Sequence, residues 1–195
     1  MEIQINKQPR KIKFSSQLTV GEYIKYYNSL NEESGSYEQL MNYIAVVTGT
    51  TYKQVSVVDI SDQDILRITA FIGIVPKLED MEELDSFYYK RAGRTIYKKS
   101  LNWRTLGARK MLEEKKLDSA LEQAVYLLSC YISKDYDSEK VELIYSELLD
   151  YDATLVFGFI VFFFKKLVNG IKPDKNCWLM RKLKAFTNIL RLSKK

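Results

Sequence analysis

The chain contains two similar halves, and this self-similarity limits its architecture more than any other feature. Thr19-Val20-Gly21 corresponds to Thr105-Leu106-Gly107, and Phe71-Ile72-Gly73 to Val156-Phe157-Gly158, at an offset of about 85 residues. Similar segments at a fixed offset indicate a repeated structural unit. We therefore predict two related modules, residues 1–80 and 86–172, followed by a separate element over residues 173–195.

Each module is predicted to open with a β-hairpin. Residues 2–14 and 87–97 alternate polar and apolar side chains, around Lys7-Gln8-Pro9-Arg10 in the first module and around Ala92-Gly93 in the second. Alternation on both sides of a turn-forming group predicts a hairpin with its turn at that group. Three helices are then expected in each module, which makes the fold class α+β and mostly α-helical.

The first helix of each module is predicted to begin at Thr19 or Thr105, and Glu22 completes a capping box behind Thr19. The second helices cover residues 37–48, ending at Gly49, and residues 118–132, because both ranges carry an apolar stripe at helical spacing. The third helix of the first module should run from about Ser61 to a stop at Pro76.

The third helix of the second module is predicted over residues 152–169 and contains a phenylalanine cluster. A core role is favoured over a groove for an apolar partner segment, since monomer surfaces rarely expose so large an apolar patch. The cluster consists of Phe157, Phe159, Phe162, Phe163 and Phe164.

Positive charge is concentrated in two places that could meet partners. The net charge is +5, and residues 175–195 hold seven basic and no acidic residues, so the rest of the chain sums to −2. Residues 176–195 are predicted to form a basic amphipathic helix, which either binds a partner or docks on the second module. The predicted partner-binding residues are Lys90, Arg91, Arg94 and Lys98 on the second hairpin, and Trp178, Arg181, Lys182 and Phe186 on the terminal helix.

Several classes of function are disfavoured by the residue inventory. The chain has no histidine, which removes the commonest general base and metal ligand. Its two cysteines, Cys130 and Cys177, are far apart, and no phosphate-binding glycine loop or complete EF-hand loop occurs. The longest apolar run, residues 155–164, is about half of what a bilayer-spanning helix needs. We expect no catalytic residues, no cofactor, no metal site and no membrane partner.

The second module resembles accessory proteins of tailed bacteriophages from the tail-assembly chaperone group. The residues that carry the resemblance are Thr105-Leu106-Gly107, the apolar residues 125–131, Tyr136-Asp137-Ser138-Glu139, and Gly158-Phe159 with residues 162–164. The tandem arrangement and the basic C-terminal helix depart from that family.

The resemblance implies a non-enzymatic phage protein that acts through protein–protein contacts, either in virion (tail or neck) assembly or as a virion structural component. Its partners would be other phage structural proteins, it could be oligomeric within an assembly, and it would be found in the host cytoplasm during assembly or in the virion. The alternative is a nucleic-acid-binding phage protein that uses the basic hairpin and the terminal helix, because the hairpin interleaves aromatic side chains with cations.

Overall fold

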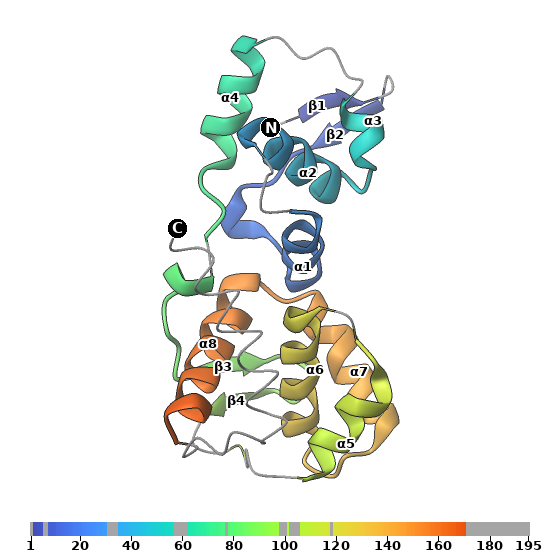
Figure 1. The fold of residues 1–195 in the computed structure, drawn as a ribbon, viewed down its shortest axis with the longest axis vertical. Coiled ribbons are helices and arrows are strands. Elements are labelled where there is room, and N and C mark those ends of the chain that lie inside the picture. The colour runs from blue at the N-terminus through green and yellow to red at the C-terminus, as the bar shows by residue number, and fades with distance from the viewer. Residues whose placement is uncertain are drawn as a thin grey trace. The chain divides into compact units, whose positions relative to one another are not determined.

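The computed structural model is α+β and mostly helical, which confirms the predicted fold class (Figure 1). It describes residues 2–5, 8–30, 35–56, 62–76, 78–97, 101, 106–117 and 119–170, and the side chains of the last helix as far as Val161. The chain forms two compact units, Met1–Pro76 and Lys77–Lys195. Within the described ranges each unit has one two-stranded hairpin and four α-helices, one helix more than predicted.

The first unit begins with an antiparallel hairpin and a 3-10 turn. Its elements are β1 (Glu2–Ile5), β2 (Gln8–Lys11), η1 (Ser15–Gln17), α1 (Val20–Ser29), α2 (Ser36–Thr48), α3 (Tyr52–Ser56) and α4 (Asp62–Ile72). Gln4 pairs with Pro9 and Ile5 with Gln8, so Pro9 lies inside β2 and the prediction that it lies in the turn is wrong. Both strands of a two-stranded sheet are edge strands, where the missing N–H of proline need not cost a ladder hydrogen bond.

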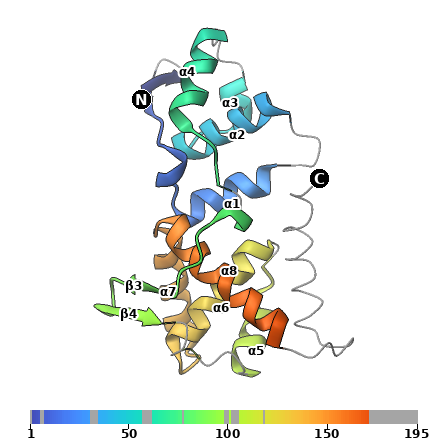
Figure 2. The ribbon, with the colours of Figure 1, turned by 90° about the vertical axis from the view of Figure 1, so that its left-hand side faces the viewer.

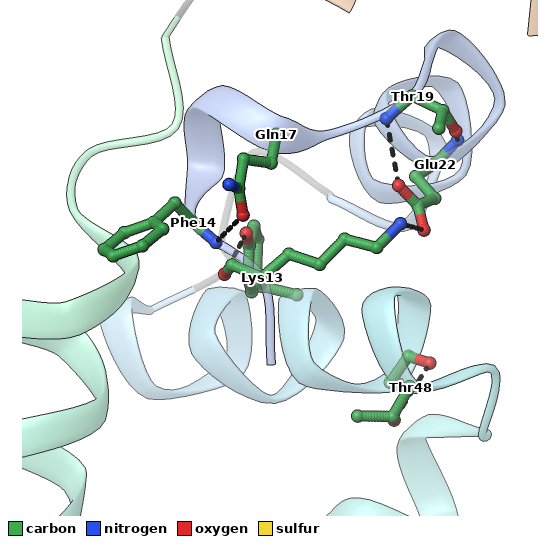
Figure 3. A network of polar contacts seen from close by, with 8 residues as sticks. Lys13, Phe14, Gln17, Thr19, Glu22 and Thr48 are labelled. Carbon is green, nitrogen blue, oxygen red and sulfur yellow. Dashed lines mark hydrogen bonds and ion pairs between the residues drawn. The ribbon is translucent and has the colours of Figure 1, made fainter. Parts of the chain in front are cut away.

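The predicted start of α1 at Thr19 is confirmed, together with its capping box. Thr19 Oγ1 accepts a hydrogen bond from the Glu22 N–H at 3.2 Å, and the Glu22 carboxylate accepts one from the Thr19 N–H at 2.9 Å. Lys13 Nζ donates to the other oxygen of the same carboxylate at 2.5 Å (Figure 3). The network satisfies helix N–H groups that have no partner within the helix, and it ties the segment after β2 to α1.

Glycines end two helices of the first unit. Gly49 follows α2 as predicted and has a φ of 65°, which a residue without Cβ adopts at no steric cost. α4 ends at Ile72, because Gly73 adopts a φ of 71° while its N–H bonds the carbonyl of Thr69 at 3.1 Å. The predicted stop at Pro76 is therefore wrong, since glycine redirects the chain before the proline is reached.

Within the described residues the second unit also has a hairpin followed by four helices, but its 3-10 turn precedes the hairpin. Its elements are η2 (Leu78–Asp80), β3 (Ser86–Tyr89), β4 (Arg94–Tyr97), α5 (Leu106–Lys115), α6 (Ala120–Ser133), α7 (Ser138–Leu149) and α8 (Ala153–Gly170). The second hairpin and its Ala92-Gly93 turn are confirmed: Ser86 pairs with Tyr97, Tyr89 pairs with Arg94, and Gly93 has a φ of 57°. Figure 2 shows both strands at one side of α6, α7 and α8.

Two helices of the second unit differ from the prediction, and in the first unit α3 was not predicted. α6 begins at Ala120 instead of residue 118, because Ser119 is its N-cap and accepts a hydrogen bond from the Leu121 N–H. α7 was not predicted at all. Asp137 caps it by accepting bonds from two backbone N–H groups, and a regular apolar stripe is buried on one face. That stripe consists of Val141, Ile144 and Leu148.

The core of the second unit is formed by the predicted stripe of α6 and by the first half of α8. Phe157 and Phe159 are fully buried, which confirms a core role for these two members of the phenylalanine cluster. The side chains of Phe162, Phe163 and Phe164 lie outside the described residues, and so does the whole element predicted over residues 173–195. The stripe of α6 comprises Leu121, Val125, Leu128 and Ile132, all buried.

Two glycines of the second unit allow close approach. A Cβ added to Gly158 in α8 would press on the carbonyl oxygen of Glu82, whose segment runs along the helix before β3. A Cβ added to Gly107 in α5 would lie 2.9 Å from Cδ2 of Tyr136. Gly107 and Tyr136, which belong to two of the motifs that carry the phage resemblance, therefore meet in space and pack against each other.

Candidate functional site

The β3–β4 hairpin has one buried and one exposed face, and most of its predicted partner-binding residues lie at its turn. Phe87, Tyr89 and Ile96 are at most 4% exposed, whereas Tyr88 is 58% and Tyr97 48% exposed. This alternation follows from the two-residue period of a strand, which points successive side chains to opposite faces. Because Tyr88 pairs with Thr95, Tyr97 is its diagonal neighbour on the outer face.

Aromatic contacts hold the inner face of the hairpin on the helices. The ring of Phe87 packs edge-on against Phe159 of α8 with centroids 5.0 Å apart, and against Tyr151 at 6.2 Å. The ring of Tyr89 lies 6.1 Å from that of Tyr151. Edge-to-face aromatic pairs add about 0.5–1.5 kcal/mol each to the burial of the rings. The hairpin is thus fixed along its inner strand face.

The turn of the hairpin is fixed as well, through Tyr151 at the junction of α7 and α8. The Tyr151 hydroxyl oxygen accepts a hydrogen bond from the Lys90 backbone N–H at 2.6 Å. The Lys90 ammonium lies 5.6 Å from the centroid of the same ring, within the range of a cation–π contact. One tyrosine therefore holds both the backbone and the side chain of Lys90.

Glu147 of α7 completes the anchor. Its Oε2 accepts a hydrogen bond from the Tyr89 hydroxyl at 2.5 Å, and its Oε1 accepts one from Arg91 Nη1 at 2.6 Å. Burial alone would raise the pKa of Glu147, but the bonds from Tyr89 and Arg91 outweigh it and hold that pKa below its ordinary value. Burial, followed by the bond to Glu147, raises the pKa of Tyr89. Both hydroxyl and carboxylate therefore keep their protonation states at neutral pH.

The described members of the predicted partner-binding set meet at the turn end of the hairpin, yet their side chains have different surroundings. Lys90 lies over an aromatic ring and Arg91 is ion-paired, whereas Arg94, at the start of β4, makes no side-chain hydrogen bond or ion pair within the described residues. The remaining predicted residues, Lys98, Trp178, Arg181, Lys182 and Phe186, lie outside the described residues.

Sequence reasoning missed the two residues that hold the hairpin, Glu147 and Tyr151. Both are distant in sequence from the strands, and Glu147 falls in the helix that was not predicted. The alternation of side chains along β3 does predict which hairpin residues are exposed. It places Tyr88 and Tyr89 on opposite faces, so only one of the two neighbouring tyrosines can present its ring to a partner.

The described parts of the chain offer no cluster of three or more histidine, cysteine, aspartate or glutamate side chains that could hold a metal ion. Cys130 is fully buried in α6, and burial raises the pKa of its thiol to about 12. A protonated, enclosed thiol is a poor nucleophile. None of the described helices combines the length and apolar character that crossing a membrane requires.

Comparison with known proteins adds no family to this picture. No family model matches the chain, and neither a curated protein nor a solved structure shows significant similarity to it. Its function is therefore inferred from the anchored hairpin and the side chains that this hairpin exposes.

Proposed function

We propose that the protein is a non-enzymatic binding protein that acts through protein–protein contacts, and that the outer face of the β3–β4 hairpin is a contact surface. The observation that supports this proposal is the pair of exposed tyrosines, Tyr88 and Tyr97, on a hairpin whose other face is anchored. Tyrosine is enriched in protein interfaces because it offers a large apolar ring with a polar end. A fixed scaffold lowers the entropy that binding costs.

The proposed setting is a tailed bacteriophage, in which the protein contacts other structural proteins during tail or neck assembly or remains in the virion. This part of the proposal rests on the sequence resemblance of the second unit. We also propose that the two units descend from one module, because both have a hairpin followed by four helices within the described residues. The hairpins pack differently, since β2 contacts α2 whereas β3 contacts α8.

Mass spectrometry of purified particles separates the two roles within this proposal. A virion component is expected among the particle proteins in a fixed stoichiometry, whereas an assembly chaperone is expected in infected cells and not in particles. Normal particle yield and morphology after deletion of the gene would overturn both roles.

The contact surface itself is tested by substituting its exposed tyrosines. Tyr88→Ser with Tyr97→Ser is expected to reduce particle yield in a complementation assay while leaving the circular dichroism spectrum unchanged. The matched control is Tyr37→Ser, which alters a tyrosine of the first unit with 49% exposure. Full complementation by the double variant would count against the hairpin as the contact surface.

A nucleic-acid role is the second candidate, because the outer tyrosines could stack on bases while Lys90 and Arg94 contact phosphates. Filter binding of a labelled oligonucleotide would then weaken steeply with salt, and replacing Lys90, Arg91, Arg94 and Lys98 by serine would abolish it. The ion pair of Arg91 with Glu147 counts against this role, since that cation already has an anionic partner. Absence of salt-sensitive retention would leave protein contacts as the remaining function.

A further inference from the structure

A cleft of about 310 Å³ lies between the turn of the β3–β4 hairpin and the α6–α7 corner. Its hairpin side is formed by Tyr89, Arg91, Ala92 and Arg94, and its helical side includes Ile132, Lys140 and Leu143. This volume is at the lower end of the range for ligand sites, and it suits one or two amino-acid side chains. The cleft belongs to the second unit alone.

Most of the charged side chains that line the cleft form ion pairs, and Arg94 is the exception among the described residues. Arg91 is paired with Glu147, and Lys140 Nζ donates to Asp135 Oδ2 at 2.5 Å. Arg94 also lines the cleft, and its guanidinium has no side-chain partner in the part of the chain that the structure describes. Since a guanidinium presents five N–H donors, Arg94 gives the cleft a positive group ready to bind an anion.

Apolar side chains of the two helices lie beside this cation. Leu143 of α7 is 40% exposed although it lines the cleft, and the buried Ile132 and Ile144 lie around it. A bound apolar side chain would remove the exposed part of Leu143 from water. An inorganic anion or a nucleic-acid phosphate would satisfy Arg94 but would leave this apolar surface uncovered.

Arg94 and Ile132 also line a second cleft of about 180 Å³, together with Tyr97, Leu101 and Lys134. Because two residues are shared, the clefts are neighbours along β4. An extended chain that crosses both would place alternate side chains in them, as peptides bound next to strands do.

We propose that this pair of clefts binds an acidic–apolar peptide segment of a partner protein. A carboxylate of the segment pairs with Arg94, and a neighbouring leucine or phenylalanine side chain packs on Leu143. The occupant follows from charge complementarity with Arg94, which has no side-chain partner within the described residues, and from the apolar surface of Leu143 next to it. The inference rests on the proposed role in protein–protein contacts and names the chemistry of the partner.

The test uses the full-length protein labelled with ¹⁵N and a capped peptide of sequence glycine-leucine-glutamate-phenylalanine-glycine. Titration is expected to shift the amide resonances of residues 91–94, 132–135 and 140–144. The same peptide with lysine in place of glutamate should bind at least about tenfold more weakly, because it loses the charge-assisted hydrogen bonds to Arg94.

Two variants with matched controls sharpen the test. Arg94→Gln should weaken binding about tenfold, and Leu143→Ala about threefold, through the lost ion pair and the lost apolar contact respectively. Arg67→Gln changes an exposed arginine of the first unit and Leu155→Ala an exposed leucine of α8, and neither should alter binding. Thermal melts that match the wild type establish that all four variants fold.

Equal binding of the lysine peptide, or binding that neither Arg94→Gln nor Leu143→Ala weakens, would overturn the inference. A resonance shift at Tyr88 without shifts at residues 91–94, 132–135 and 140–144 would also overturn it, because it would place the peptide on the outer face of the hairpin. Failure of the cleft is distinguishable from failure of the proposed function: if the peptide does not bind while the Tyr88 and Tyr97 substitutions still reduce particle yield, only the cleft inference falls.

Discussion

Replacing Gly158 by alanine tests how firmly the segment before β3 is packed on α8. In an unobstructed helix interior this change stabilises a protein by about 0.5–1 kcal/mol, because glycine loses more backbone freedom on folding than alanine does. At Gly158 the added Cβ would press on the carbonyl oxygen of Glu82 and lie 3.3 Å from Leu84 Cγ. The Leu84 N–H also donates a hydrogen bond to the Gly158 carbonyl, at 3.3 Å.

Whether Gly158→Ala raises or lowers the free energy of unfolding depends on whether the segment that contains Glu82 and Leu84 can move. A carbonyl oxygen cannot rotate away as a long side chain does, so the whole segment must shift. Overpacking costs about 1–3 kcal/mol, and loss of the Leu84–Gly158 hydrogen bond costs about 1 kcal/mol. After the gain in helix propensity is subtracted, we expect Gly158→Ala to lower the free energy of unfolding by about 1–3 kcal/mol.

Urea denaturation followed by tryptophan fluorescence measures this change. Both tryptophans, Trp103 and Trp178, belong to the sequence of the second unit, so their emission is expected to report on its unfolding. Leu155→Ala is the control in the same helix, because this side chain is 46% exposed and its loss should change the free energy by no more than about 0.5 kcal/mol. A Gly158→Ala variant as stable as the wild type, or more stable, would refute the close packing of the segment on α8.

Three further changes test the hairpin anchor and the cap of α1. Tyr89→Phe removes the hydroxyl that donates to Glu147 and should lower stability by about 1–2 kcal/mol, whereas Tyr88→Phe, at the exposed neighbour, should have no measurable effect in the same urea titration. Burial acts to raise the pKa of Glu147, but the bonds from Tyr89 and Arg91 outweigh it and hold the pKa below its ordinary value of about 4.3. The ionised carboxylate therefore contributes fully to the stability of the fold above that pH, and this contribution is lost as the pH falls through the lowered pKa. The stability difference between wild type and Glu147→Gln should therefore shrink on acidification, and a difference independent of pH would contradict the anchor. Thr19→Ala should destabilise the first unit by about 1 kcal/mol in a circular dichroism melt, because it removes the hydroxyl that caps α1. The control Ser16→Ala, which alters an exposed serine nearby, should cause no change.

Local signals in the sequence predicted most elements of the fold. The capping box of Thr19 and Glu22, the stripe of α6 and the Ala92-Gly93 turn depend on residues within a few positions of one another, and each is confirmed. α7 carried a comparable signal, since Asp137 precedes apolar residues at helical spacing. It was missed because aspartate is favoured in turns as well as at N-caps, and Asp137 is the N-cap of a helix.

The errors and gaps arise where two local signals compete or where a contact joins distant residues. Gly73 and Pro76 are both helix terminators, and the sequence does not show which acts first. The anchoring of the hairpin by Glu147 and Tyr151 joins positions more than fifty residues apart, and periodicity contains no information on such pairs. The position of Arg94 in a cleft is likewise a tertiary property, because it requires α6 and α7 to lie beside β4.

The two neighbouring tyrosines of β3 show that fixing one side chain on the helices determines which side chain is exposed to a partner. Tyr89 is buried because its hydroxyl has a charged acceptor in Glu147, which offsets the cost of removing a polar group from water. Once Tyr89 is fixed on the inner face, the two-residue period of the strand leaves Tyr88 on the outer face. The other oxygen of the same carboxylate pairs with Arg91 beside the turn. Glu147 therefore fixes the hairpin both at its inner face and at its turn, and this anchoring holds the outer aromatic face in place.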